Sequence, residues 1–294
     1  MTLSSQEHAA ALETRRAERL AQEALAIIEA AQRNGARLRL TGGLAVRRYA
    51  TDLDFMDREF SDIDFIGLSR ESARLQRAFD GLGYEQDRHV AQATGGAQLQ
   101  YARRARLLES HDHLLKRPRP LAAANVGLPA ADHIDVFLDV MRMDHDVDVR
   151  SRLDIDPMAI SPADILLTKL QMGELAEKDV HDIVALLKDV PLGETDDNAG
   201  IDVRRLAGAC AQDWGLAFDV NASLETVVAL LAGFALPEAE RTRVSARVTA
   251  LQAAIARQEK SLRYRLRARV GTRLPWRREI EEREGSPDDR ATAA

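Results

Sequence analysis

The sequence predicts an α/β domain followed by a helical domain. Two observations indicate the first part: short alternating or apolar segments typical of strands, and a strand–Gly–Gly–helix pattern between them. A third observation indicates the helical domain, because apolar residues recur at helical spacing from residue 161 onward. We therefore expect an N-terminal helix over 1–35, an α/β domain over 36–160, a helical domain over 161–275 and a disordered tail over 276–294.

Composition is that of an ordinary globular protein, with 45% hydrophobic and 30% charged residues among 294. The formal net charge of −6 argues against a protein that coats nucleic acid by bulk positive potential. The single cysteine, Cys210, excludes an internal disulfide or a CxxC metal site and fits a reducing cytoplasm. No apolar run approaches the roughly 20 residues of a membrane span, and the N-terminus lacks signal-peptide order. We expect a cytoplasmic protein without a membrane segment.

The first elements are a long helix and a strand that leads into two glycines. A helix is expected over 4–34, with a Ser4–Glu7 capping box and Gly35 as its stop. The strand over 37–40 runs into Thr41, Gly42 and Gly43, and a helical segment follows. Glycine admits an anion close to the backbone, and a helix N-terminus favours phosphate. The alternative is a simple tight turn, and neither the Walker A nor the dinucleotide fingerprint is matched.

Two D-x-D patterns follow the glycines. Asp52 and Asp54 lie in a polar segment, 52–57, that predicts a loop. Asp62 and Asp64 lie in REFSDIDFIG, where an apolar run indicates a buried strand. Residues two apart on a strand project to one side, so these two carboxylates should converge and suit Mg²⁺ bound with substrate phosphates. The alternative is an edge strand with a solvated acidic face.

A helix over 69–82 and one or two strands within 84–101 are expected next. Three histidines carry donors that suit a metal, but solvent-facing positions are favoured for them: His111, His113 and His145.

The strongest strand pattern is DHIDVFLDV, residues 132–140, with apolar side chains on one face and Asp135 near the middle of the other. An unpaired buried acid costs several kcal/mol. A cation shared with Asp62 and Asp64 would supply the partner, which makes Asp135 a third ligand and Asp139 the alternative.

The second half opens with a helix start, Ser161 at the N-cap and Pro162 at the first position. This helix carries Lys169, and a second helix over 177–189 carries Asp179. Two interpretations stay open: the lysine extends to solvent and the acid complements the helix dipole, or both belong to a site.

Together, two glycines after a strand, R-x-x-S-D-I-D-F and a distant apolar strand with one central acid resemble the nucleotidyltransferase fold of the DNA polymerase β superfamily. This resemblance implies an α/β domain with a mixed sheet. It assigns Gly42 and Gly43 to the triphosphate, Asp62 and Asp64 to the metals, and Asp135 to the third acid. The glycine-to-acid interval is longer than in minimal members, and Gly43 replaces a frequent serine.

PADILLTKLQ followed by EKDVHDIVALL is similar to abortive-infection toxins of the AbiEii type. That resemblance implies that Lys169 and Asp179, with Asp182 as the alternative, complete the site, and that Lys169 contacts the triphosphate.

The implied activity is transfer of NMP from an NTP such as ATP to RNA or protein, with Mg²⁺ or Mn²⁺, in a toxin–antitoxin role with a partner protein. The alternatives are a non-catalytic nucleotide- or partner-binding protein and a small-molecule, antibiotic-type nucleotidyltransferase.

Beyond residue 200, three helices are expected over 201–214, 222–234 and 237–269. The segment from Arg257 to Arg278 contains nine Lys or Arg residues and one acidic residue, and Tyr264 and Trp276 lie among them. This pattern fits either a solvated helix face or an RNA-binding surface.

Overall fold

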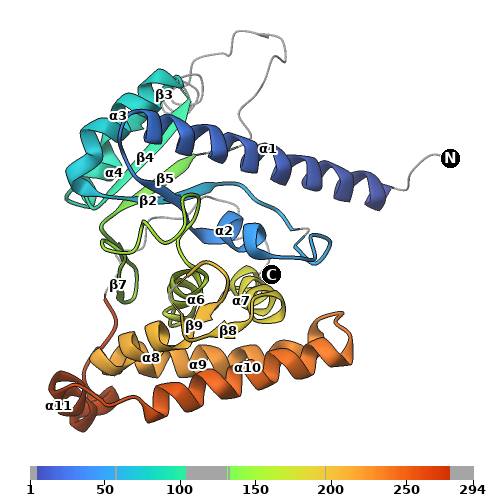
Figure 1. Cartoon of the computed structure of the whole chain (residues 1–294), viewed down its shortest axis with the longest axis vertical. Helices are drawn as coiled ribbons and strands as arrows, with labels where there is room; N and C mark the ends of the chain where they lie inside the picture. Colours follow the sequence, from blue (N-terminus) through green and yellow to red (C-terminus); the bar gives the residue numbers. More distant parts are fainter. Residues whose placement is uncertain (1–4, 57, 104–130, 132, 196, 279–294) are drawn as a thin grey trace, which may run out of the picture.

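The structure is a computed structural model that describes residues 5–56, 58–103, 131, 133–195 and 197–278. Its centre is a five-stranded sheet with the strand order β1-β2-β5-β4-β3, shown in Figure 1. β2 and β5 are parallel, and every other neighbouring pair is antiparallel. The prediction of an α/β protein with a mixed sheet is therefore confirmed.

The sheet strands are short, and the two central ones are the most deeply buried. Their bounds are β1 Leu38–Leu40, β2 Ile63–Gly67, β3 Tyr84–Asp87, β4 Gln98–Arg103 and β5 Ile134–Leu138. β2 and β5 are mostly buried because helices cover the sheet, which explains their almost continuous apolar sequence.

Helices α1 (Ser5–Arg33) and α3 (Ser72–Gly81) pack together above the sheet in Figure 1. The long N-terminal helix is present as expected and stops before Gly35, whose φ of +73° suits glycine. Ser4 lies outside the described residues, so its capping box stays a prediction. The expected helix over 69–82 is a 3₁₀ turn, Ser69–Glu71, followed by α3.

Between β3 and β4 the chain forms a short helix, α4 (Arg88–Ala93), which the sequence did not predict. Asp87 caps it by accepting a hydrogen bond from the His89 backbone amide.

Below the sheet, α2 (Gly42–Tyr49) contacts α6 and α7, which join the sheet to the remaining helices (Figure 1). The helices of the second half are α6 Pro162–Leu170, α7 Glu177–Asp189, α8 Val203–Gln212, α9 Trp214–Leu230, α10 Glu238–Arg257 and α11 Leu262–Val270. Two short strand pairs accompany them: β6 (Val140–Arg142) with β7 (Asp146–Asp148), and β8 (Leu192–Gly193) with β9 (Ile201–Asp202). Leu231–Gly233 and Gly271–Arg273 form 3₁₀ turns.

Buried apolar side chains form one continuous cluster from α1 to α10. The domain boundaries expected from the sequence stay predictions, because this core runs through the sheet and the helices alike.

One segment, Trp214–Gly233, is long and apolar enough to cross a membrane, contrary to the expectation that no such run exists. Its most apolar window is 50% buried inside the protein. The segment contains α9, which contacts α6, α7, α8, α10 and α11. Packing in the centre of this helical layer accounts for its apolar composition.

Several predicted boundaries were wrong. The strand expected over 132–140 ends at Leu138, because Asp139 has a φ of +67° and turns the chain into β6. The helix expected over 237–269 is interrupted after Arg257, and Ser261 begins α11 by accepting a hydrogen bond from the Tyr264 amide.

Candidate active site

The D-x-D pair lies at the start of β2, with Asp62 directly before the strand and Asp64 within it. Ile63 and Phe65 are fully buried, so Asp62 and Asp64 alternate with core side chains, as the sequence predicted. Asp62 and Asp64 are partly buried, and one oxygen of Asp62, Oδ1, is shielded from solvent with no hydrogen-bond partner among the described residues. A buried unpaired carboxylate oxygen is costly and indicates a missing partner at this position.

Asp135 is brought to the same place by strand pairing, because Asp64 and Asp135 are directly opposite each other in the parallel β2–β5 pair. Gln98 and Gln100 of β4 donate their side-chain amides to Asp135 Oδ1 at 2.8 and 3.1 Å. On the other oxygen, His133 Nε2 lies 3.2 Å from Asp135 Oδ2, and the same nitrogen lies 4.0 Å from Asp62 Oδ2. The His133 imidazole therefore bridges two of the three carboxylates.

Gly42 begins helix α2 in contact with the second acid. Its φ is +66°, and a Cβ built there would lie 2.1 Å from Asp64 Oδ2. The preceding residue ties the two segments together, since the Thr41 amide donates to the Asp64 carbonyl at 2.9 Å. Thr41 makes no side-chain cap on α2, and its buried hydroxyl has no partner within the described chain. The glycine is thus required by backbone conformation and by close approach to Asp64.

The second glycine has a different neighbour. A Cβ on Gly43 would lie 2.2 Å from Arg58 Nη2 and 3.1 Å from the Phe60 ring. The Arg58 guanidinium lies 4.3 Å from the centroid of Phe60. Arg58 therefore covers the start of α2, and the absence of a side chain at Gly43 makes room for it.

The carboxylates perturb one another. Burial, together with repulsion from Asp135 and Asp62, raises the pKa of Asp64 to about 7, against the attraction of Lys169 and His133. Burial also acts to raise the pKa of Asp135, but the hydrogen bonds from His133, Gln98 and Gln100 outweigh it and hold that pKa below its ordinary value.

His133 responds in the opposite direction. Its hydrogen bond to Asp135 raises the pKa of the imidazole above the ordinary value despite partial burial, with further attraction from Asp62 and Asp64. When protonated, the ring supplies positive charge among three acids.

The helical half contributes an ion-pair cluster beside these acids. Lys169 Nζ of α6 lies 2.7 Å from Asp179 Oδ1 and 2.9 Å from Asp182 Oδ2, both on α7. Asp182 is fully buried and also accepts hydrogen bonds from Nε and Nη2 of Arg58, the closest at 2.9 Å. Burial acts to lower the pKa of Lys169, but the two acids outweigh it and raise it. Lys169 also lies close enough to Asp64 for its charge to act against the upward shift of the pKa of that carboxyl.

The donor set fits a hard divalent cation in part. No three His, Cys, Asp or Glu side chains among the described residues are grouped as a ready-made metal site. Nevertheless, Asp62 carries an unpartnered buried oxygen, and Asp64 is an acid destabilised by two neighbouring acids. Two carboxylates are what Mg²⁺ commonly takes from a protein before substrate phosphates complete its shell. Asp135 fits less well, because His133 and two glutamines already occupy its oxygens.

Other residues singled out in the sequence lie elsewhere. Asp52 and Asp54 are in a loop, as expected, and line a separate pocket with α7 and α10. Asp139, the alternative third acid, follows β5 and accepts a hydrogen bond from the Ser69 amide. His145 is buried and bonds to Asp219 at 2.7 Å instead of facing solvent. His111 and His113 lie outside the described residues.

The end of the basic stretch from Arg257 to Arg278 packs against the protein, whereas α11 within it has no buried residues. Arg277 pairs with Asp219 at 2.8 Å, and the Trp276 indole donates to the same carboxylate. Trp276 also meets the Phe218 ring edge-on at 5.2 Å. Trp276 therefore anchors the end of the described chain to α9.

Sequence reasoning missed four residues of the site: Thr41, Gln98, Gln100 and His133. For His133 a signal was available, because it shares the face of its strand with Asp135 by simple alternation. The pairing of β4 with β5, which brings the glutamines to Asp135, was not readable in the sequence.

No protein-family model matches the chain, and no curated protein shows significant similarity to it. Function must therefore be argued from the residues and their arrangement.

Proposed function

We propose that the protein is a metal-dependent nucleotidyltransferase that transfers a nucleoside monophosphate from an NTP and releases pyrophosphate. The observation that carries the proposal is the convergence of Asp62, Asp64 and Asp135, from two strands whose paired residues are 71 positions apart, beside the glycine start of α2. Like charges in one cluster repel, and the raised pKa of Asp64 indicates that His133 and Lys169 offset this repulsion only in part, so the cluster favours a further cation. A helix start next to it offers backbone amides to phosphate oxygens.

The residues of the site have separate roles in the proposed reaction. The backbone amides at Gly42 and Gly43, at the start of a helix that the Thr41 side chain does not cap, bind the triphosphate. Lys169 neutralises charge on the leaving pyrophosphate, with Asp179 and Asp182 fixing its ammonium group. Asp135, fixed by His133 and the glutamines, orients the acceptor group for attack on the α-phosphorus.

Asp62 and Asp64 are the residues that would hold Mg²⁺ or Mn²⁺. When bound, such an ion neutralises the phosphate oxygens and steadies the departing pyrophosphate.

The test is label transfer. The full chain is incubated with each of four α-³²P-labelled NTPs, Mg²⁺, total RNA and cell extract, and labelled products are separated into RNA, protein and small molecules. We expect label in one class, abolished by Asp64→Asn and retained by Asp80→Asn, an exposed acid on α3. Absence of transfer with every NTP and acceptor would refute the proposal. The same separation distinguishes a toxin-like RNA or protein modifier from an antibiotic-type enzyme.

A non-catalytic nucleotide-binding protein on this scaffold is the second candidate. One observation favours it: the bonds that His133, Gln98 and Gln100 make to Asp135 leave that acid no free oxygen. Stabilisation by NTP and Mg²⁺ without transfer would select this alternative.

A further inference from the structure

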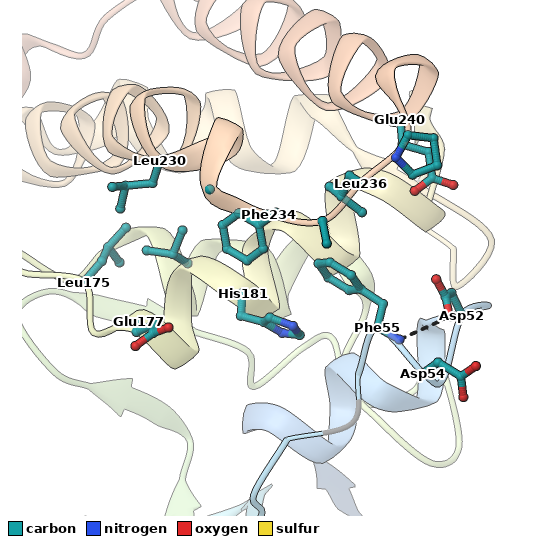
Figure 2. A pocket seen from close by; sticks show the side chains of 14 residues that line it. Asp52, Asp54, Phe55, Leu175, Glu177, His181, Leu230, Phe234, Leu236 and Glu240 are labelled. Atoms are coloured by element: carbon teal, nitrogen blue, oxygen red, sulfur yellow. Dashed lines mark hydrogen bonds between the residues drawn. The ribbon is translucent and has the colours of Figure 1, made fainter. Parts of the chain in front are cut away.

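A cavity lies beside α7, and none of the acids Asp62, Asp64 and Asp135 lines it. It has a volume of about 890 Å³ and is formed by the 52–55 loop, the start of α7 and the connection between α9 and α10 (Figure 2). None of the residues assigned to nucleotide transfer lines it. Its volume is in the range of small-molecule sites.

The middle of this cavity is aromatic and apolar. The Phe55 and His181 rings stack with centroids 4.4 Å apart and planes 12° from parallel. Phe234 tilts against both, at 6.0 Å from Phe55 and 5.8 Å from His181. Leu175 and Leu230 continue this surface toward one end in Figure 2. Burial lowers the pKa of His181, so the imidazole is neutral at physiological pH and adds no positive charge.

Acids stand at the two ends of the aromatic surface. In Figure 2 Glu177 lies toward one end, whereas Asp52, Asp54 and Glu240 lie toward the other. Lys188, at 3.5 Å from Asp52 Oδ2, compensates that one carboxylate. The other three form no ion pair within the described part of the chain. Each end of the cavity therefore carries uncompensated negative charge.

A buried cation of the protein itself lies over the Phe55 ring. The ammonium of Lys188, which is 2% exposed and does not line the cavity, lies 5.3 Å from the centroid of Phe55, within the distance of a cation–π contact. A ligand that spans the cavity thus meets a carboxylate, an aromatic and aliphatic middle, and a second group of carboxylates.

We propose that this cavity binds a linear polyamine, a flexible chain with ammonium groups at both ends and methylenes between them. The charges match the two acidic ends, and the methylenes match the Phe55, His181 and Phe234 surface. An isolated monoamine satisfies only one end, and an inorganic cation leaves the apolar middle uncovered. Chain length is therefore the property that the cavity selects.

The first test is calorimetric titration of the full-length protein, at fixed low ionic strength, with diamines of three to eight methylenes, spermidine, butylamine and Mg²⁺. The expected result is an affinity maximum at one chain length, with butylamine binding at least about tenfold more weakly. Affinity that depends on charge alone, with no preferred length, would overturn the proposal because any acidic surface attracts cations.

The second test uses matched variants. Glu177→Gln and Glu240→Gln remove one charge from each end, and each should weaken spermidine binding about two- to fivefold. Glu225→Gln removes the same charge from an exposed position on α9 outside the cavity and should leave binding unchanged. Phe234→Leu keeps an apolar side chain but removes the ring. It should shift the preferred chain length of the polyamine or weaken the preference for one length.

Circular dichroism and thermal melting establish that each variant is folded. Equal affinities for wild type, Glu177→Gln and Glu240→Gln would overturn the site. Failure here leaves the proposed nucleotide transfer intact, because that proposal rests on Asp62, Asp64 and Asp135 and is read by label transfer.

Discussion

Replacement of Gly42 by alanine tests the link between the helix start and the acid cluster. Gly42 has a φ of +66°, and an added Cβ would lie 2.1 Å from Asp64 Oδ2 and 3.1 Å from Asp64 Cβ. The substitution therefore has two effects, strain in the backbone and displacement of the Asp64 carboxylate. The first lowers stability, and the second should remove cation and nucleotide binding.

The backbone effect alone is about 1–2 kcal/mol, the cost of an L-residue in the left-handed region. For a protein of this size, each kcal/mol shifts Tm by roughly 2–4 °C, so we expect a decrease of about 2–8 °C before the steric term is added. Thermal denaturation with and without Mg²⁺ and NTP measures both effects. The ligand-induced increase in Tm should disappear in Gly42→Ala.

Two further variants isolate the causes. Gly208 lies within α8, where an added Cβ meets nothing within 4 Å, so Gly208→Ala should raise stability by up to about 1 kcal/mol. In an Asp64→Ala background the carboxylate is absent, so Gly42→Ala should lose the clash with Oδ2 and keep its backbone cost and the 3.1 Å contact with the Cβ of residue 64. A Gly42→Ala protein with unchanged Tm and unchanged nucleotide binding would refute the reasoning, and so would strict additivity of the two substitutions.

Three other predictions concern the same site. Asp62→Asn should leave metal-free stability equal or slightly higher, because it relieves like-charge repulsion, while stabilisation by NTP and Mg²⁺ disappears; unfolding with retained nucleotide binding would contradict this. The folded-state pKa of Asp64 is raised to about 7, so ionising this carboxyl costs the folded protein free energy. In chelator, the metal-free protein should therefore lose stability as pH rises from about 4 to 7. Urea titrations measure this profile, and Asp64→Asn should flatten it. Lys169→Met removes the ammonium group that pairs with Asp179 and buried Asp182, and should lower the stability of the protein by about 3 kcal/mol. Urea denaturation measures this change. A decrease under about 0.5 kcal/mol, the size of a surface effect, would mean that the pairs are solvated.

Local signals determined much of the fold in advance. The start of α6 was predicted from Ser161 and Pro162, and the Ser161 hydroxyl does accept the Asp164 amide at 3.2 Å. The bounds of α7 agree with the prediction over 177–189. Both segments combine capping chemistry or first-turn acids with a helical apolar period, so neighbouring residues suffice to define them.

Where local signals were weak, the sequence failed at element ends. The interruption at Gln258 and the end of β5 at Leu138 both depend on single backbone conformations, the second being the +67° φ of Asp139. The short helix α4 also went unpredicted, because the segment has neither a strong period nor a long apolar run.

The candidate site divides in the same way. The sequence alone determined that Gly42 follows a strand and that Asp62 and Asp64 share one side of the next, because these relations involve residues close in the chain. Only tertiary structure decided that Asp135 faces Asp64, that His133 and two glutamines occupy it, and that Lys169 meets Asp179 and Asp182. Those contacts follow from strand order and helix packing across tens of residues. The alternation of side chains along a strand and the capping residues of a helix do not determine these contacts. Each strand or helix pattern is compatible with several neighbouring elements in the fold.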